Sequence, residues 1–420
     1  MVFLHAMHII YNLLIYLASF ALRIVALFSK KIKLFVDGRK DVVHILGKNI
    51  STSDKTIWFH CASLGEFEQG VPIMEEMKKA KPGHKIIVSF FSPSGYEIKK
   101  NTSLADVVVY LPMDTPLNAK RFIDAIHPSL SIFVKYEFWP NYLLQLKKKN
   151  IPTLLVSGVF RDNQIFFKPY GGFMRKALKS FNHFFLQEEN SVKLLNSIGF
   201  KNTTLSGDTR FDRVSHQIEM NNTLKFAKEF KGDALCVVCG STWPEDEAVL
   251  LDYINSAPRN VKFIIAPHKI EQSKIEAFTE KLYKQKVILH SQKDDVNLAE
   301  YSVLIIDCIG LLTKLYSYAD IAYVGGAMGR TGLHNILEPA TFGVPIIIGK
   351  NYHEFPEAIR LRNLAGLFSI SNPLELSDVL TKLVSDANYR KKTGMISGHF
   401  VNSNTGATKK VLDYIAKHHN

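Results

Sequence analysis

Short apolar runs alternate with amphipathic stretches from residue 56 onward, and this alternation limits the folds that the chain can adopt. Apolar strands separated by helical patterns are typical of parallel βαβ units. The first series of predicted strands covers residues 56–60, 85–90, 107–111, 130–134, 153–156 and 183–186. The second series covers residues 234–239, 262–266, 286–289, 303–307, 321–324 and 345–348.

The two series predict two domains, because 420 residues are too many for one ordinary hydrophobic core. A polar stretch over residues 212–232 shows no strand pattern and separates them. We therefore expect an α/β protein with two doubly wound, Rossmann-like domains and an active site in the cleft between them. The predicted parts are an anchor helix at 1–28, a first domain at 29–212, a linker at 213–232, a second domain at 233–395 and a helical tail at 396–420.

The N-terminal segment is a candidate membrane anchor. Residues 9–22 are nearly all apolar, which is marginal for a span of about 20 residues. No small-residue cleavage site follows, so we do not expect a cleaved signal peptide. Whether the segment spans the membrane or lies flat on it, the basic residues that follow it are expected to keep the rest of the chain on the cytoplasmic side. The alternative is a buried core helix. The basic residues are Arg23, Lys30, Lys31, Lys33, Arg39 and Lys40.

The net charge of +13 indicates an anionic partner, such as nucleic acid, anionic lipid or a phosphorylated substrate. Nucleic acid has no specific support, since the sequence has no zinc-finger spacing and no RNA-binding aromatic signature. Cys236 and Cys239 have CxxC spacing but fall in a predicted buried strand, where their side chains would point to opposite faces. They are expected to be core thiols and not metal ligands.

Two carboxylates follow predicted strands in the first domain. Glu66 follows the strand at 56–60 and a turn of small residues, and it is expected in or near the first turn of a helix whose pattern is clear at 71–79. It is either a helix-dipole partner or a general base, and Glu68 is the competing candidate for the base. Glu137 follows the strand at 130–134, beside Tyr, Phe and Trp residues. Partial burial predicts a partner for Glu137, either a structural cation or a catalytic group.

Two arginines at the ends of strands in the same domain are candidate anion-binding groups. Arg210 lies in the sequence Gly-Asp-Thr-Arg-Phe-Asp at 207–212, and Arg161 lies behind the strand at 153–156. A guanidinium near a cleft can hold a carboxylate or a phosphate through two hydrogen bonds. Ordinary surface salt bridges are the alternative for both.

The sequence from 322 to 339 gives the strongest functional signal in the second half. A predicted strand runs into Gly325 and Gly326, and a short helix with the sequence His-Asn-Ile-Leu-Glu-Pro follows. Glycines allow backbone to approach a phosphate, and Glu338, three residues after Asn335, can accept from ribose hydroxyls. This segment therefore predicts nucleotide binding. Three more loops follow strands at the same edge, at 240–245 with a helix cap at Ser241 or Thr242, at 266–269 and at 307–312.

Taken together, these motifs resemble the 3-deoxy-D-manno-octulosonic acid (Kdo) transferases of lipopolysaccharide synthesis, over nearly the whole chain. The matching segments are ASLGE at 62–66, YEFWPN at 136–141, GDTRFD at 207–212, GST at 240–242, and GG at 325–326 with HNILE at 334–338. The resemblance implies the GT-B fold and an inverting enzyme without metal or cofactor. Such an enzyme would move Kdo from CMP-Kdo to the lipid A precursor lipid IVA at the inner membrane, with its catalytic domains on the cytoplasmic side.

The resemblance also implies roles for individual residues. Glu66 corresponds to the proton acceptor, while Glu137 and Arg210 correspond to transition-state stabilisers. The implied acceptor contacts are Ser63, Gly65 and Arg161. The implied CMP contacts are Ser241, Pro267, His268, Gly310, Leu311, Leu312, Gly326, Asn335, Ile336, Leu337 and Glu338.

This sequence departs from the family at three of these places. The family has lysine at the position of Arg210, and a carboxylate at the position of Leu311. It also has arginine and histidine after the proline, where this chain has His268 and Lys269. Other readings also stay open. One is a membrane-associated glycosyltransferase that uses a UDP-sugar, or a sugar-nucleotide epimerase. The other is a lipid A-binding protein without catalytic activity.

Overall fold

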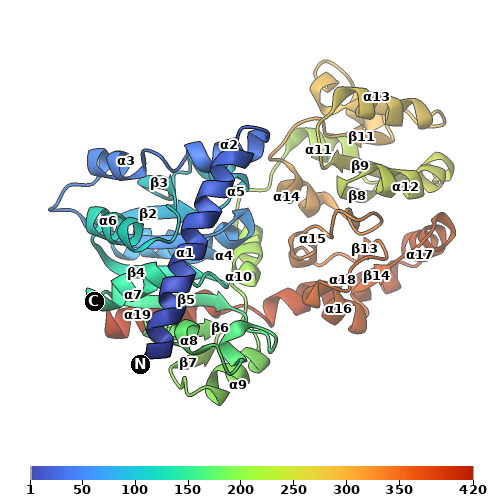
Figure 1. Cartoon of the computed structure of the whole chain (residues 1–420). Helices are drawn as coiled ribbons and strands as arrows, with labels where there is room; N and C mark the ends of the chain where they lie inside the picture. The colour runs from blue at the N-terminus through green and yellow to red at the C-terminus, as the bar shows by residue number, and fades with distance from the viewer. Residues whose placement is uncertain (1, 420) are drawn as a thin grey trace. The chain divides into compact units, whose positions relative to one another are not determined.

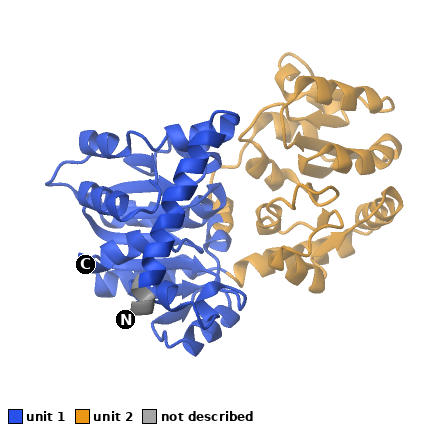
Figure 2. Ribbon diagram, viewed as in Figure 1, with its two compact units in different colours: residues 1–213, 405–420 blue, residues 214–404 orange. Residues whose placement is uncertain are grey.

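The computed structural model describes residues 2–419 and contains two compact units (Figures 1 and 2). The first unit combines the residues up to Arg213 with those from Thr405 onward, and the second consists of Val214–Asn404. Each unit contains a seven-stranded sheet whose neighbouring strands all pair in parallel. The prediction of two doubly wound α/β domains is therefore confirmed.

The sheet of the first unit has the strand order β3-β2-β1-β4-β5-β6-β7, which reverses direction between β1 and β4. The strands are β1 (Lys55–Cys61), β2 (His84–Phe90), β3 (Val107–Tyr110), β4 (Pro128–Val134), β5 (Thr153–Gly158), β6 (His183–Leu186) and β7 (Thr203–Leu205). The helices are α1 (Val2–Val25), α2 (Lys30–Asp37), α3 (Val42–Asn49), α4 (Leu64–Ala80), α5 (Pro93–Lys99), α6 (Pro116–Ile126), α7 (Pro140–Lys148), α8 (Gly172–Leu178), α9 (Glu189–Ser197), α10 (Thr209–His216) and α19 (Ala407–His418).

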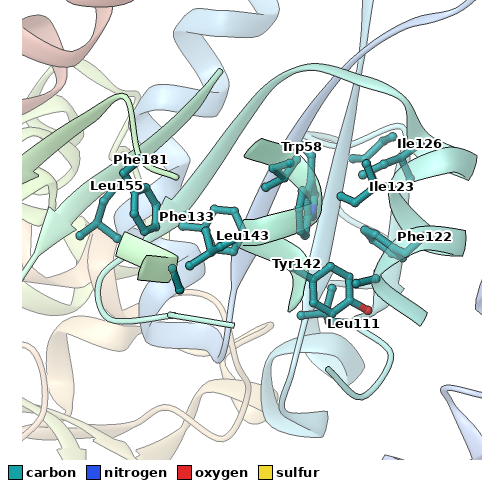
Figure 3. Close-up of a cluster of buried hydrophobic side chains, with 14 of the residues drawn as sticks. Trp58, Leu111, Phe122, Ile123, Ile126, Phe133, Tyr142, Leu143, Leu155 and Phe181 are labelled. Carbon is teal, nitrogen blue, oxygen red and sulfur yellow. The ribbon is translucent and has the colours of Figure 1, made fainter. Parts of the chain in front are cut away.

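Apolar side chains cover both faces of this sheet. On one face, the fully buried ring of Trp58 in β1 lies 5.0 Å from Phe133 in β4, 5.2 Å from Phe122 in α6 and 5.9 Å from Tyr142 in α7 (Figure 3). On the other face, residues of α4 and α19 form a core with β1, β2 and β4. Strands covered on both faces are nearly continuous apolar runs, which is why the sequence reveals them.

The sheet of the second unit has the order β10-β11-β9-β8-β12-β13-β14 and reverses between β8 and β12. The strands are β8 (Leu235–Thr242), β9 (Val261–Pro267), β10 (Val287–Leu289), β11 (Val303–Ile305), β12 (Ile321–Val324), β13 (Ile346–Ile348) and β14 (Leu367–Ser369). The helices are α11 (Lys225–Lys231), α12 (Pro244–Ser256), α13 (Gln272–Lys281), α14 (Leu312–Leu315), α15 (Leu337–Thr341), α16 (Pro356–Asn363), α17 (Pro373–Ser385) and α18 (Ala387–Asn402). Cys236 and Cys239 are buried free thiols in β8, as predicted.

The N-terminal helix α1 presents a largely exposed apolar surface, which excludes the alternative of a buried core helix. Ala6–Val25 is long and apolar enough to cross a membrane by length and composition. One polar face of α1 nevertheless docks on the first unit. The Tyr11 hydroxyl donates to Asp114 at 2.7 Å, and Asn141 donates to Asn12 at 2.9 Å. The Asp114 carboxylate is almost completely buried, and this burial raises its pKa to about 6. It accepts three hydrogen bonds, from the Tyr11 hydroxyl and from the backbone N–H groups of Asn141 and Tyr142.

Helix α19 completes the first unit from the far end of the sequence. Its Val411 and Ile415 are buried in the core that α4 and the strands form. The Asp212 carboxylate in α10 holds the start of the helix, since it accepts from the backbone N–H of Gly406 at 2.5 Å and from the N–H and hydroxyl of Thr408, both at 2.7 Å. Asp212, the second acidic residue of the 207–212 motif, therefore connects α10 to the start of α19.

Replacing Asp212 with alanine is expected to lower the free energy of unfolding by about 2 kcal/mol, because three hydrogen bonds to one carboxylate are lost. Urea unfolding of the full chain measures this loss. Limited proteolysis should then cut the variant first within residues 405–420, where α19 begins. An unchanged unfolding midpoint would show that apolar packing alone holds α19.

Candidate active site

The two candidate carboxylates of the first unit follow neighbouring strands at the point where the strand order reverses. Glu66 comes after β1 and Glu137 after β4. In open parallel sheets, this reversal leaves a crevice beyond the carboxyl ends of the strands, where ligands bind. The buried thiol of Cys61 lies at the end of β1 beside both groups. Burial raises the pKa of Cys61 well above its ordinary value, and the negative charges of Glu66 and Glu137 raise it further.

Glu66 is the third residue of α4, which begins at Leu64, ahead of the clear helical pattern at 71–79. Only 7% of the residue is exposed, and the hydroxyl of Ser63 donates a hydrogen bond to its Oε2 atom. The first turn of a helix favours a negative charge. Ser63 and Glu66 thus form one local unit in which a serine orients a buried carboxylate, while Gly65 between them is exposed.

Glu68 lies two residues further along α4 and has a different environment. Its carboxylate pairs with Lys99 at 3.1 Å and with Arg213. Two cations on one partly exposed carboxylate are typical of a structural ion-pair cluster. This geometry favours Glu66 over Glu68 as the candidate base.

The partners of Glu137 are aromatic nitrogen groups. The indole N–H of Trp139 donates to Oε2 at 2.7 Å, and Nε2 of His60 lies 3.3 Å from the same oxygen. The side chain of Glu137 is 13% exposed. The predicted partner is therefore present, and it is neither lysine nor arginine.

Arg210 is tied to the helix that carries Glu66. Its guanidinium donates to Asp208 at 2.8 Å, and Gln69 of α4 donates to the same aspartate at 3.2 Å. Gln69 lies one helical turn after Glu66, so this network links the start of α10 to the candidate base. Arg161 is exposed in the loop after β5, where its backbone N–H donates to Gln164 at 2.9 Å.

The second unit contains a cavity of about 250 Å³ at the carboxyl ends of its strands. Three of the predicted loops contribute to it, together with the start of α14. The cavity is lined by Ser241, Gly310, Leu312, Thr313, Tyr316, His334, Asn335 and Glu338. Five of these residues were predicted donor contacts, whereas Thr313, Tyr316 and His334 were not among them. Ser241 lies at the carboxyl end of β8 and the 325–338 segment follows β12, so the cavity also lies where the strand order reverses.

Glu338 is held in place from two directions. The Asn335 amide donates to Oε1 at 3.1 Å, and the hydroxyl of Thr313 donates to Oε2 at 3.1 Å. Asn335 precedes helix α15 and does not lie within it, because the helix begins at Leu337. The two side chains therefore meet across the helix start and not along one helical face.

The glycine pair after β12 brings backbone close to α12. A Cβ atom on Gly325 would lie 2.9 Å from the Asp246 carboxylate, and Gly326 has φ of 96°, which side chains rarely adopt. The buried Asp246 accepts from the N–H groups of Gly326 and Trp243, both at 2.9 Å. Trp243 is the N-cap of α12, so the predicted cap at Ser241 or Thr242 was wrong. The Asp246 carboxylate thereby joins the loop after β8 to the glycine loop after β12.

The remaining predicted donor contacts do not line this cavity. Ile336 and Leu337 are buried, so only their backbone could meet a ligand. Leu311 is the N-cap residue of α14, and Gly326 packs against the backbone of Gly332. Pro267 is the last residue of β9 and His268 follows it, where the ring of His268 stacks on that of Trp243 with centroids 4.6 Å apart.

An aromatic stack borders the cavity at His334. Its ring lies 4.5 Å from that of His268, and the indole of Trp243 donates to its Nε2 atom at 3.1 Å. Burial, together with the smaller effect of the neighbouring His268, lowers the pKa of His334 to about 4. His334 is therefore neutral at pH 7, with its proton on Nδ1.

The stability of the second unit is expected to decrease as the pH falls from about 6.5 to about 4. The folded-state pKa of His334 lies below the ordinary value of 6.5, so the unfolded chain binds more protons in this window. Thermal unfolding across this pH range measures the effect. His334→Gln should give a shallower dependence, whereas an identical slope in both proteins would contradict it.

Comparison with known proteins places these features in a family. Residues 39–213 match the family model described as 3-deoxy-D-manno-octulosonic-acid transferase (kdotransferase). The 3-deoxy-D-manno-octulosonic acid transferase of Aquifex aeolicus is 29% identical over 335 residues, covering 78% of this chain and 86% of that protein. The enzyme of the same name from Haemophilus influenzae is 27% identical over 371 residues, covering 86% of each chain. The chain is therefore similar to Kdo transferases over most of its length, and the predicted resemblance is confirmed. The chain is thus a glycosyltransferase, and the reading as a non-catalytic lipid A-binding protein is set aside.

Solved structures similar to this chain confirm the GT-B-like fold. The UDP-GlcNAc 2-epimerase of Neisseria meningitidis has a TM-score of 0.62 at 14% identity, covering 86% of this chain and all of that one. MurG of Acinetobacter baumannii has a TM-score of 0.54 at 13% identity, covering 86% of this chain and 99% of that one. At these identities the likeness concerns the fold and not the substrate.

Proposed function

We propose that this Kdo transferase moves Kdo from CMP-Kdo to the lipid A precursor lipid IVA, with inversion at the anomeric carbon and without a metal ion. The observation that supports the proposal best is the cavity in the second unit, where loops matched to CMP contacts meet around Glu338. A volume of about 250 Å³ suits the nucleoside monophosphate part of a donor.

The carboxylate of Glu338 suits the ribose of the donor. Asn335 and Thr313 orient both of its oxygens, so the carboxylate can accept from ribose hydroxyls without a further change of conformation. His334, neutral and protonated on Nδ1, offers an N–H donor at the same cavity.

The first unit supplies the groups for the transfer step. Glu66 takes the proton of the acceptor hydroxyl, and the oxygen forms its bond to the anomeric carbon of Kdo. The bond from that carbon to the phosphate oxygen breaks, and CMP leaves with the electron pair. A single displacement of this kind inverts the anomeric centre. Glu137 and Arg210 stabilise the charge that develops during the step.

The decisive experiment measures Kdo transfer from freshly made CMP-Kdo to lipid IVA by the purified full chain, with and without EDTA. Transfer that survives EDTA supports the proposal. Transfer that EDTA abolishes contradicts the metal-free mechanism. Activity on a UDP-sugar in place of CMP-Kdo would overturn the donor assignment.

The lipid acceptor gives α1 a function. We propose that α1 lies in the interface of the inner membrane, with the catalytic units on the cytoplasmic side. Its polar face is bound to the first unit through Tyr11 and Asn12, and a helix crossing the bilayer would lose these contacts. Its other face exposes apolar side chains such as Leu13 and Leu17, which an interfacial helix would place among the lipids.

The double change Leu13→Asp and Leu17→Asp is expected to reduce binding to anionic vesicles at least about 10-fold, because two apolar side chains leave the lipid. Vesicle co-sedimentation measures this change. If α1 lies in the interface, alkaline carbonate should also extract the wild-type protein from membranes. Retention in the membrane after carbonate treatment would indicate a spanning helix instead.

A further inference from the structure

A buried row of polar side chains runs through the first unit and ends at Glu137. Trp58 and His60 stand two residues apart in β1, so both point to the same face of the sheet. Ser89 in β2 is the register partner of His60. All three side chains are completely buried, so each polar atom must find its partner within the protein.

The contacts of this row set the direction of every proton. The indole of Trp58 can only donate, and it donates to the Ser89 hydroxyl at 2.8 Å. Nδ1 of His60 lies 2.9 Å from the same hydroxyl. If Nδ1 carried a proton, Ser89 would accept twice and its own proton would face neither neighbour. The arrangement that uses every group has Ser89 donating to Nδ1, which places the imidazole proton on Nε2.

Nε2 of His60 faces the carboxylate of Glu137 at 3.3 Å. The indole N–H of Trp139 lies 3.0 Å from Nε2 but 2.7 Å from Oε2 of Glu137, and the charged oxygen is the stronger acceptor. Two N–H groups therefore converge on Oε2. This leaves Oε1 as the oxygen that acts on the substrate.

We propose that His60 is a positioning residue of the transfer reaction, and that Trp58 and Ser89 determine which of its nitrogens bears the proton. The inference rests on the proposed function, in which Glu137 stabilises the reacting groups. His60 touches no substrate itself. It holds one oxygen of Glu137 so that the other keeps a single orientation during the step.

Two amide replacements separate positioning from packing. His60→Gln keeps an N–H donor near the place of Nε2, whereas His60→Asn reaches only the place of Nδ1. We expect His60→Asn to reduce kcat by about 10- to 100-fold and His60→Gln to restore most of that loss. The KM for CMP-Kdo should stay unchanged in both variants, because the donor cavity belongs to the other unit. Equal losses in the two variants, or no loss in either, would overturn the inference.

Ser89→Ala keeps the test informative if a His60 variant does not fold. This variant leaves the imidazole in place and removes the group that directs its proton. A clear fall in kcat is expected, and an unchanged kcat would overturn the inference. Nitrogen-15 NMR of histidine-labelled protein measures the tautomer of His60 directly, without an activity assay. The imidazole of the wild-type protein should be protonated on Nε2. Protonation on Nδ1 would contradict the proposed relay.

Glu137→Gln distinguishes failure of this inference from failure of the proposed function. If Glu137→Gln retains full transfer activity, the proposed role of Glu137 is wrong. If Glu137→Gln is inactive while His60→Asn is fully active, only the positioning role of His60 is wrong.

Discussion

Replacing Glu66 with glutamine is expected to reduce kcat for Kdo transfer by about 100- to 10,000-fold, the usual contribution of a positioned general base. The amide cannot take a proton from the acceptor hydroxyl. Its carbonyl oxygen can still accept from Ser63, so the first turn of α4 should stay intact. Kdo transfer is measured at saturating CMP-Kdo, and the melting temperature of the variant verifies its fold.

Glu68→Gln is the matched control, since it makes the same chemical change two residues away on the same helix. Its carboxylate pairs with Lys99 and Arg213 at the surface, so its loss should change activity by less than about threefold. If Glu66→Gln transferred Kdo at the wild-type rate while Glu68→Gln was inactive, the assignment of the base would be reversed.

Replacing Glu338 with glutamine is expected to raise the KM for CMP-Kdo by about 10- to 100-fold. A hydrogen bond to a charged group contributes about 1.5–3 kcal/mol, and 1.4 kcal/mol corresponds to a factor of ten. Calorimetric titration with CMP should show the same loss of affinity without any acceptor present. The KM for the lipid acceptor should not change.

Glu354→Gln is the control for this variant, because Glu354 is an exposed carboxylate of the same unit and does not line the cavity. Both variants lose one negative charge, so a general electrostatic effect would appear in both. Equal affinity for CMP in the wild type and Glu338→Gln would remove Glu338 from the donor site.

The sequence reveals those elements whose burial leaves a pattern. Strands such as β1 and β8 are buried on both faces. The bounds of β1 were predicted within one residue, whereas β8 extends three residues beyond its predicted end. Two strands, β7 and β14, were missed. Each has only three residues and lies at an edge of its sheet, where part of the strand meets solvent and no apolar run is needed. The first turn of α4 was expected near Glu66, but the helical pattern is clear only from residue 71, because glycines and a proline within α4 weaken the helical signal.

The candidate site also contains residues that the sequence predicts and residues that it does not. Motif residues at the ends of strands, such as Glu66 and Glu338, can be placed from the sequence because parallel strands bring their ends to one edge. Thr313 and Tyr316 could not be placed in this way. They reach the cavity from α14 and the turn after it, and nothing in their local sequence distinguishes them from core residues. The role of Asp212 was equally hidden, since its partners lie in a segment made much later in the chain.

The placement of α19 has a consequence for how the protein emerges from the ribosome. The second unit is continuous in sequence, so it can fold as soon as it has been translated. The first unit must wait, although most of it is synthesised earlier, because residues from 405 onward supply its last helix. During that interval the surface of α4 that Val411 and Ile415 later cover is open to water. Nascent chains therefore expose a transient apolar surface that a chaperone can shield, and the half of the protein with the candidate base matures last.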